Sequence, residues 1–181
     1  MGDGAAAATR SWPHDIYDVF KEFKVRQVPY VPDGGHIPLI EAVHADPEIH
    51  AVPLTTEEEG IAMSAGAWLG GHRSVLLMQS SGVGNCANMF SLTRLGNFPF
   101  LTLVTMRGEF GEFNPWQVPM GTNTPALLAM SDLVVLRADH ADEVREVVRN
   151  AANMAFNGGA RVAVLLSQRL IGAKVFVSED Q

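Results

Sequence analysis

The stretch TTEEEGIAMSAGAWLGG, residues 55–71, decides the fold that we expect for this chain. It follows a short apolar run and then changes period, because Ile61, Ala65, Trp68 and Leu69 recur at helical spacing. Ala and Gly occupy most of the other positions, which allows the helix to lie close to another backbone or to a flat ligand. The stretch therefore predicts a helix of small residues directly after a strand.

Consecutive acids open this expected helix. Thr56 with Glu59 three residues later forms a capping box, and carboxylates in a first turn are favourable beside the helix dipole. The residues alone thus give these acids a structural role. A catalytic role for one of them requires a second observation.

Strands and helices alternate along the rest of the chain, and most of the strands are continuously apolar. This pattern predicts a parallel sheet covered on both faces, an α/β fold with three layers and a doubly wound sheet. We expect one domain over residues 12–181, preceded by a flexible tail at residues 1–11. The expected strands cover residues 28–31, 49–54, 74–79, 100–105, 133–136 and 162–166, and the expected helices cover residues 12–23, 37–43, 56–71, 86–95, 125–130 and 141–156.

Composition excludes several classes of function. The net charge is −7, and no basic cluster offsets it, which argues against a nucleic-acid partner. No apolar run reaches the length of a membrane span, and the first residues lack the features of a secretory signal. The single cysteine, Cys86, excludes a disulfide framework within the chain and suits a reducing compartment. We therefore expect a cytoplasmic location.

Two further segments carry a family resemblance. QSSGVGN at residues 79–85 ends a buried strand in a glycine turn, and MRGE at residues 106–109 follows the next strand. Together with the Glu-Glu-Gly junction of the central helix, they resemble the pyrimidine-binding domain of thiamine diphosphate enzymes. The resemblance covers about residues 15–121 and extends to the alpha subunits of sulfopyruvate decarboxylases and to related phosphonopyruvate decarboxylases.

The resemblance implies a function, a cofactor and a partner. It implies the alpha subunit of a thiamine diphosphate-dependent 2-oxoacid decarboxylase, with sulfopyruvate as the leading substrate, converted to sulfoacetaldehyde and carbon dioxide. Phosphonopyruvate or another 2-oxoacid is an alternative substrate, and a non-catalytic binding or regulatory subunit is an alternative function. Thiamine diphosphate and Mg²⁺ are implied as cofactors, with the metal and the diphosphate held by a beta subunit. A hetero-oligomer with at least two copies of each chain is expected.

One sequence feature imitates the metal motif of the family. GDG at residues 2–4 matches the start of the magnesium and diphosphate motif of thiamine diphosphate enzymes. No strand precedes it here, and no asparagine follows at the distance that the family needs, since the first asparagine is Asn85. We interpret the match as coincidence. The scattered histidines also lack metal-ligand spacing, so we expect no metal site on this chain.

By the resemblance, Glu59 takes the position of the glutamate that activates the cofactor, because it directly precedes Gly60. Glu57 and Glu58 are interpreted as capping or surface acids. The glycine turn is expected to flank the aminopyrimidine, while the alternative from the residues themselves is a tight strand-to-helix turn without a ligand. The expected cofactor-binding residues are Glu59, Ser81, Gly82, Val83, Gly84 and Asn85.

The expected substrate-binding residues are Gly34, His36, Arg107 and Gln117. His36 is alternatively a polar residue at the surface start of a helix. Arg107 faces an anionic substrate in one interpretation and pairs with Glu109 or Glu112 in the other, and the sequence leaves this open. Gln117-Val118 stands where many 2-oxoacid decarboxylases carry paired histidines, so a histidine proton relay does not carry over.

The segment between residues 107 and 124 is expected to be a long irregular loop. Such loops in compact domains are usually functional or disordered. This one carries Phe110, Phe113, Trp116 and Met120, which a disordered loop would not normally expose. We therefore expect it to pack against a partner chain or the cofactor site.

Overall fold

A computed structural model describes residues 11–172 of the chain. The flexible tail expected at residues 1–11 lies outside the described residues except for Ser11, and so does the end of the expected domain, residues 173–181. The GDG segment also lies outside them. The expected division of the chain into a tail and one domain therefore stays a prediction.

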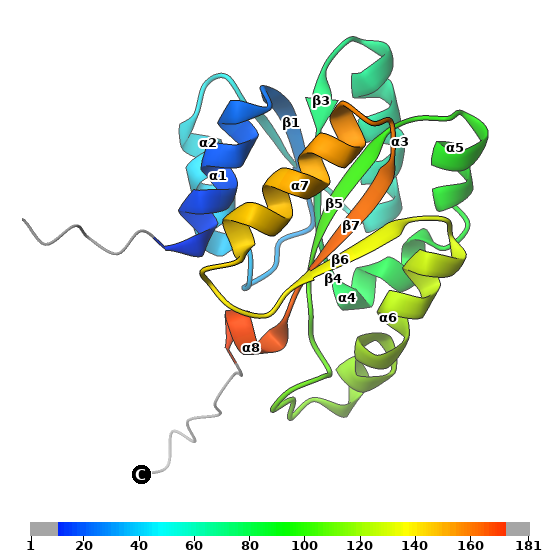
Figure 1. The fold of residues 1–181 in the computed structure, drawn as a ribbon. Helices are drawn as coiled ribbons and strands as arrows, with labels where there is room; N and C mark the ends of the chain where they lie inside the picture. Colours follow the sequence, from blue (N-terminus) through cyan, green and yellow to red (C-terminus); the bar gives the residue numbers. More distant parts are fainter. Residues whose placement is uncertain (1–10, 173–181) are drawn as a thin grey trace, which may run out of the picture.

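A parallel sheet forms the middle layer, with the strand order β2-β1-β4-β5-β7-β6 and β3 paired to β1 (Figure 1). All of its described pairings are parallel, as the continuously apolar strands predicted. The strands are β1 Val25–Tyr30, β2 His50–Pro53, β3 Arg73–Ser74, β4 Leu76–Gln79, β5 Phe100–Thr105, β6 Val134–Ala138 and β7 Arg161–Leu166.

Helices cover both faces of this sheet (Figure 1). One apolar core joins it to α1 Trp12–Glu22, α2 Ile37–Ala45 and α7 Val144–Phe156. The other core joins it to the remaining helices, α3 Glu57–Leu69, α4 Ser80–Val83, a 3-10 turn at Gly84–Cys86, α5 Phe90–Leu95 and α6 Val118–Met130. A 3-10 turn at Pro115–Gln117 precedes α6, and α8 Gln168–Ile171 follows β7. The expected three-layer α/β fold is confirmed.

Alternation along the central strands explains the two cores. Leu76 and Met78 of β4 lie in the core with α3, while Leu77 between them lies in the core with α1, α2 and α7. All three are fully buried, and burial of one such side chain stabilises the fold by about 1.5–3 kcal/mol. A continuously apolar strand is thus what a sheet buried on both faces requires.

The structure corrects several expected boundaries. β1 begins at Val25 rather than at residue 28, and the strand expected at residues 74–79 is divided into β3 and β4. The glycine turn after β4 is itself largely helical, as α4 and the following 3-10 turn. Within residues 11–172, no helix has the length and apolarity that a membrane-spanning segment requires.

The largest correction concerns the expected loop over residues 107–124. The expectation is wrong for residues 118–124, which are helical because α6 begins at Val118. Pro119 lies in the first turn, where proline is tolerated, whereas Gly121 and Pro125 lower the helix propensity of this segment, and tertiary contacts outweigh propensity. Gly121 packs so closely on the carbonyl of Arg107 that an added Cβ would lie 2.3 Å from its oxygen, which fixes this helix against the preceding segment.

The strand order creates a crevice at the carboxyl edge of the sheet. The chain leaves β1 toward β2 on one side and leaves β4 toward β5 on the other, so the direction of winding reverses between β1 and β4. Open α/β sheets bind ligands at such a switch point, outside the carboxyl ends of the strands. The central helix α3 starts at the same edge, because it directly follows β2.

Candidate active site

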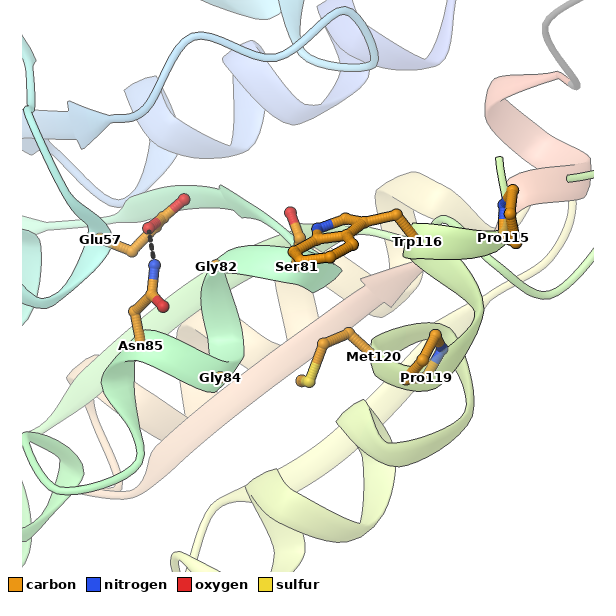
Figure 2. A pocket seen from close by; sticks show the side chains of 9 residues that line it. All are labelled: Glu57, Ser81, Gly82, Gly84, Asn85, Pro115, Trp116, Pro119 and Met120. Carbon is orange, nitrogen blue, oxygen red and sulfur yellow. Dashed lines mark hydrogen bonds between the residues drawn. The ribbon is translucent and has the colours of Figure 1, made fainter. Parts of the chain in front are cut away.

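A cavity of about 760 Å³ opens at this carboxyl edge (Figure 2). Three segments form it: the first turn of α3, the turn after β4, and the segment that leads into α6. Its lining residues are Glu57, Ser81, Gly82, Gly84, Asn85, Pro115, Trp116, Pro119 and Met120. The cavity therefore combines one carboxylate, a wall of small residues and a wall of apolar residues.

Glu57 is the carboxylate of the cavity. It is only 8% exposed, and its Oε2 accepts a hydrogen bond from Asn85 Nδ2 at 3.0 Å (Figure 2). Gly82 leaves room for it, because a Cβ added there would lie 2.2 Å from Glu57 Oε1. The turn after β4 thus positions the Glu57 carboxylate in two ways. Gly82 leaves the space that it occupies, and the Asn85 amide donates a hydrogen bond to it.

Helix geometry explains why Glu57 points inward. It lies four residues before Ile61 and seven before Ser64, and both are buried on the face of α3 that packs on the sheet. Gly60 completes this face, since an added Cβ would lie 2.4 Å from a methyl group of Leu76. The small residues of α3 therefore serve close packing against β4, which places the first turn at the cavity.

Glu59 lies outside the cavity. It is exposed, and its Oε2 accepts a hydrogen bond from the backbone N–H of Thr55 at 3.1 Å. Its carboxylate thus acts as a cap at the start of α3, although Thr56 itself makes no side-chain cap. The structure therefore places these two acids differently from the expectation, while their roles stay predictions. Glu57, interpreted as a capping or surface acid, is the buried acid of the cavity, and Glu59 has the capping position.

The glycine turn after β4 reaches the cavity with most of its expected residues. Ser81, Gly82, Gly84 and Asn85 line the cavity. Val83 does not, because its side chain is fully buried in the core with α3 and α5. The geometry thus places four of the five expected turn residues where a ligand would contact them, and the fifth supports the turn from within the core.

The residues expected at the substrate are absent from the cavity lining. Gly34 is exposed in the loop after β1. His36 is fully buried at the start of α2, where its ring faces the backbone of Met78 and Leu103. Burial lowers the pKa of this imidazole, against the opposing effect of the Asp33 carboxylate. Gln117 has a buried side-chain oxygen without a partner, but its neighbour Trp116 lines the cavity instead.

Arg107 is engaged in a buried ion pair. Its Nε and Nη2 donate to the two carboxylate oxygens of Glu112 at 2.6 and 2.7 Å, and the two side chains are 12% and 3% exposed. The alternative in which Arg107 pairs with Glu112 is therefore the one that the structure contains, while Glu109 pairs with Arg137. The guanidinium of Arg107 does not line the cavity.

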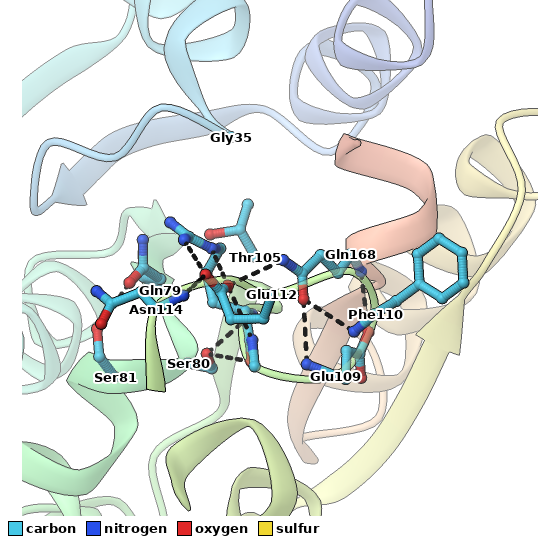
Figure 3. A network of polar contacts seen from close by, with 12 residues as sticks. Gly35, Gln79, Ser80, Ser81, Thr105, Glu109, Phe110, Glu112, Asn114 and Gln168 are labelled. Carbon is cyan, nitrogen blue, oxygen red and sulfur yellow. Dashed lines mark hydrogen bonds and ion pairs between the residues drawn. The ribbon is translucent and has the colours of Figure 1, made fainter. Parts of the chain in front are cut away.

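Glu112 is the centre of a polar network that also contains Asn114 and Gln168 (Figure 3). Besides the guanidinium, it accepts hydrogen bonds from the backbone N–H groups of Gly108 and Asn114 and from Gln168 Nε2. The bond from Arg107, with smaller contributions from these donors, lowers the pKa of the Glu112 carboxyl to about 2. This network fixes the course of the chain just before Pro115 and Trp116, so it sets one wall of the cavity.

A second polar network crosses the switch point. Asp33 accepts hydrogen bonds from Gly35 N, from Gln79 Nε2 at 2.6 Å and from Thr105 Oγ1 at 2.6 Å. The Ser81 hydroxyl, which lines the cavity, donates to Gln79 Oε1 at 2.9 Å. Sequence reasoning missed Asp33 and Gln79. The sequence could have indicated both residues. Each is a polar residue at or just beyond the carboxyl end of one of the two strands that flank the switch point, where ligands bind.

The cavity suits a flat heterocycle that carries a ring nitrogen able to share a proton. A buried carboxylate stands beside a glycine floor that permits close approach, and Trp116 with Met120 supplies an apolar cover. This donor and acceptor set fits an aminopyrimidine ring. In the described part of the chain, no group of at least three His, Cys, Asp or Glu side chains is placed to hold a metal ion.

Comparison with known proteins identifies relatives of this chain. No family model matches the chain. The sulfopyruvate decarboxylase subunit alpha of Methanococcus maripaludis is 33% identical over 152 residues, which are 83% of this chain and 91% of that relative. The subunit of the same name from Methanothermobacter thermautotrophicus is 39% identical over 129 residues, 71% of this chain and 78% of the relative. A phosphonopyruvate decarboxylase of Streptomyces viridochromogenes is 38% identical over 111 residues, 60% of this chain but only 28% of its own length.

A solved structure supports the fold. A 2-oxoglutarate:ferredoxin oxidoreductase from Magnetococcus marinus superimposes with a TM-score of 0.69 at 14% identity, over 90% of this chain and 29% of that one. The chain thus shares its fold with part of this 2-oxoacid oxidoreductase. More specifically, the chain belongs to the family of sulfopyruvate decarboxylase alpha subunits.

Proposed function

We propose that the chain is the pyrimidine-binding alpha subunit of a thiamine diphosphate-dependent 2-oxoacid decarboxylase, with sulfopyruvate as its leading substrate. The names of the relatives and the shared fold support the class of reaction. The observation that carries the proposal is the buried Glu57 carboxylate, which faces a cavity of small and apolar residues at the switch point of the sheet. We propose Glu57, rather than Glu59, as the activating acid.

The residues of the cavity have separate tasks in this proposal. When bound, the cofactor supplies a carbanion nucleophile and an electron sink for loss of carbon dioxide. Glu57 holds a proton shared with a ring nitrogen of the cofactor, and Asn85 orients the carboxylate through the bond to Oε2. Gly82 lets the ring approach. Trp116 and Met120 exclude water from one side.

We further propose that a beta subunit binds the diphosphate and Mg²⁺, in an assembly with at least two copies of each chain. The names of the relatives, each a subunit alpha, support a second subunit. A cytoplasmic location stays a prediction that rests on the single cysteine, which is buried and reduced within the fold.

Reconstitution with the diphosphate-binding subunit of the same organism tests the proposed function. We expect the complex to release carbon dioxide from sulfopyruvate only when thiamine diphosphate and Mg²⁺ are present, and the isolated chain to release none. Phosphonopyruvate is the second candidate substrate, favoured by the Streptomyces relative, and a higher kcat/KM for it would replace sulfopyruvate. No turnover of any 2-oxoacid by a complex that binds the cofactor would favour a non-catalytic subunit.

A further inference from the structure

The cavity wall formed by this chain contains an anion but no cation. Glu57 is its only ionisable side chain, and no Lys, Arg or His of residues 11–172 lines it. The proposed substrate carries a carboxylate and, on its other end, a sulfonate or a phosphonate. A buried anionic group needs a charged or hydrogen-bonding partner, and a neighbouring carboxylate makes this need greater. The anionic tail of the substrate therefore lacks a counter-ion on the described wall.

The arginines next to this wall already have partners. Arg107 is paired with Glu112 through two hydrogen bonds. Releasing it would leave a buried carboxylate without its cation, which strongly destabilises a fold. The engaged guanidinium thus belongs to the framework of the segment and is not available to a ligand.

Two more arginines, Arg137 and Arg169, contact residues of the same segment. Arg137 donates to both carboxylate oxygens of Glu109, at 3.1 and 2.8 Å, and to Asp139 at 2.9 Å. The guanidinium of Arg169 on α8 lies 4.3 Å from the ring centroid of Phe110. Neither lines the cavity. His36 is no substitute, because it is fully buried and does not line the cavity.

The rim of the cavity is apolar and exposed. Trp116 is 83% exposed although it lines the cavity, and Phe113 and Val118 beside it are also exposed. Contiguous apolar surface of this kind usually marks an interface. A subunit that covers this rim would also close the cavity. Its surface would then face the wall that carries the Glu57 carboxylate, which has no cation beside it among the lining residues. Charge complementarity then favours cationic groups on the covering surface.

We propose that the partner subunit docks on the Trp116 rim and supplies the cation that binds the anionic tail of the substrate. Selection among sulfonated, phosphonated and uncharged 2-oxoacids then resides in the partner, while this chain supplies the activating carboxylate. This inference rests on the proposed function, and it takes the place of the expected role of Arg107 as the ligand of the tail.

Binding of a non-reactive sulfonate tests the inference without any turnover. Calorimetry with sulfoacetate is carried out on the full chain alone and on its complex with the partner subunit, at constant ionic strength. We expect binding to the complex that is at least tenfold tighter than binding to the isolated chain. Equal affinity for the two would place the cation on this chain and overturn the inference, and so would binding to neither.

Kinetic selectivity gives the second test, measured as the ratio of kcat/KM for sulfopyruvate to kcat/KM for pyruvate. The variants Arg107→Gln, Arg137→Gln and Arg169→Gln should each leave this ratio within twofold of the wild-type value, even where both rates fall. Arg10→Gln and Lys174→Gln extend the test to cations outside the described residues.

Neutralising one lysine or arginine of the partner's facing surface should lower the ratio at least tenfold. A tenfold loss caused instead by a variant of this chain would overturn the inference. Failure of the proposed function is recognised separately, because the complex would then decarboxylate no 2-oxoacid although sulfoacetate binding could still be measured.

Discussion

Two glutamates have buried carboxylates, Glu57 in the cavity and Glu112 in the segment that leads to Trp116, and their surroundings differ in kind. Glu112, after β5, accepts hydrogen bonds from the Arg107 guanidinium, two backbone N–H groups and Gln168. Glu57, at the start of α3, accepts one hydrogen bond within the described part of the chain, from Asn85. A carboxylate whose acceptor sites are filled holds a fold together. One that is buried with acceptor sites left over is available to a ligand.

The difference indicates that the Glu112 charge stabilises the fold, whereas the Glu57 charge is left for a ligand. The Glu112 network orders the segment that carries Trp116, so that the apolar wall of the cavity is formed before a ligand arrives. Glu57 instead depends on Gly82 for space and on Asn85 for direction. Substitution of the two glutamates should therefore affect different properties. Substitution of Glu112 should lower the free energy of unfolding, and substitution of Glu57 should lower turnover.

The largest effect we expect is on turnover. Glu57→Gln keeps the size of the side chain and its bond with Asn85 but removes the proton-sharing carboxyl, so kcat of the reconstituted complex should fall by about 10²–10⁴-fold. Glu59→Gln is the matched control, since it makes the same chemical change two residues along the same turn and outside the cavity. Steady-state decarboxylation assays of both variants check this. Equal losses in the two would remove the distinction between them.

The second effect is on stability. Glu112→Ala leaves Arg107 without its counter-ion, and breaking a buried pair from one side costs about 3–5 kcal/mol of the free energy of unfolding. Glu48→Ala is the control, because Glu48 pairs with Lys21 at an exposed position and an exposed pair contributes about 0–1 kcal/mol. Urea denaturation of the two variants measures the contrast. Similar losses would mean that the Glu112 network does not hold the segment.

A smaller effect separates two glycines, Gly82 beside Glu57 and Gly66 farther along α3. Gly82→Ala would place a Cβ 2.2 Å from the Glu57 carboxylate, and forced overpacking of this kind costs about 1–3 kcal/mol. Gly66→Ala on α3 meets nothing within 4 Å and should raise stability by up to about 1 kcal/mol, since Ala favours a helix. Thermal unfolding compares the two, and cofactor affinity of the complex should fall for Gly82→Ala alone. Unchanged stability and affinity in Gly82→Ala would show that Glu57 can move aside.

The smallest effect is a pH dependence. The folded pKa of Glu112 is lowered from 4.5 to about 2, chiefly by Arg107, so its contribution to stability is present above pH 4.5 and is lost as the pH falls toward 2. Glu112→Gln should be less stable than wild type at pH 6, and the gap should narrow at pH 3. Denaturation curves at the two pH values measure it. A gap of constant size would contradict the assigned pairing.

The sequence predicted the layers of the fold because strand hydrophobicity and helix period are local signals. It also predicted the turn after β4, where glycines and polar residues follow a buried strand. It expected the acid of the cavity at Glu59, although helical phase favours Glu57 for the buried position: Glu57 is four residues before the buried Ile61, whereas Glu59 is two before it and is exposed. The capping pattern of Thr56 with Glu59 competed with that signal.

The remaining misses depended on contacts between distant segments. The pairing of Arg107 with Glu112 rather than with Glu109 depends on where the segment turns, and backbone N–H groups fix that turn. The early start of α6 places Pro119 in the first turn, where proline is tolerated, and it is accompanied by the close approach of Gly121 to Arg107. Neither contact is visible in a single sequence, because propensity describes a segment without its neighbours.

The central claim is that the Glu57 carboxyl shares a proton with the ring nitrogen of the bound cofactor. The most direct measurement is the ¹⁵N NMR shift of thiamine diphosphate labelled at N1′, bound to the complex of this chain with its partner subunit. The wild type and Glu59→Gln should show a shift displaced toward the protonated nitrogen, and Glu57→Gln should show the shift of the free, unprotonated ring. A displaced shift that persists in Glu57→Gln, or one that is lost in Glu59→Gln, would contradict the account.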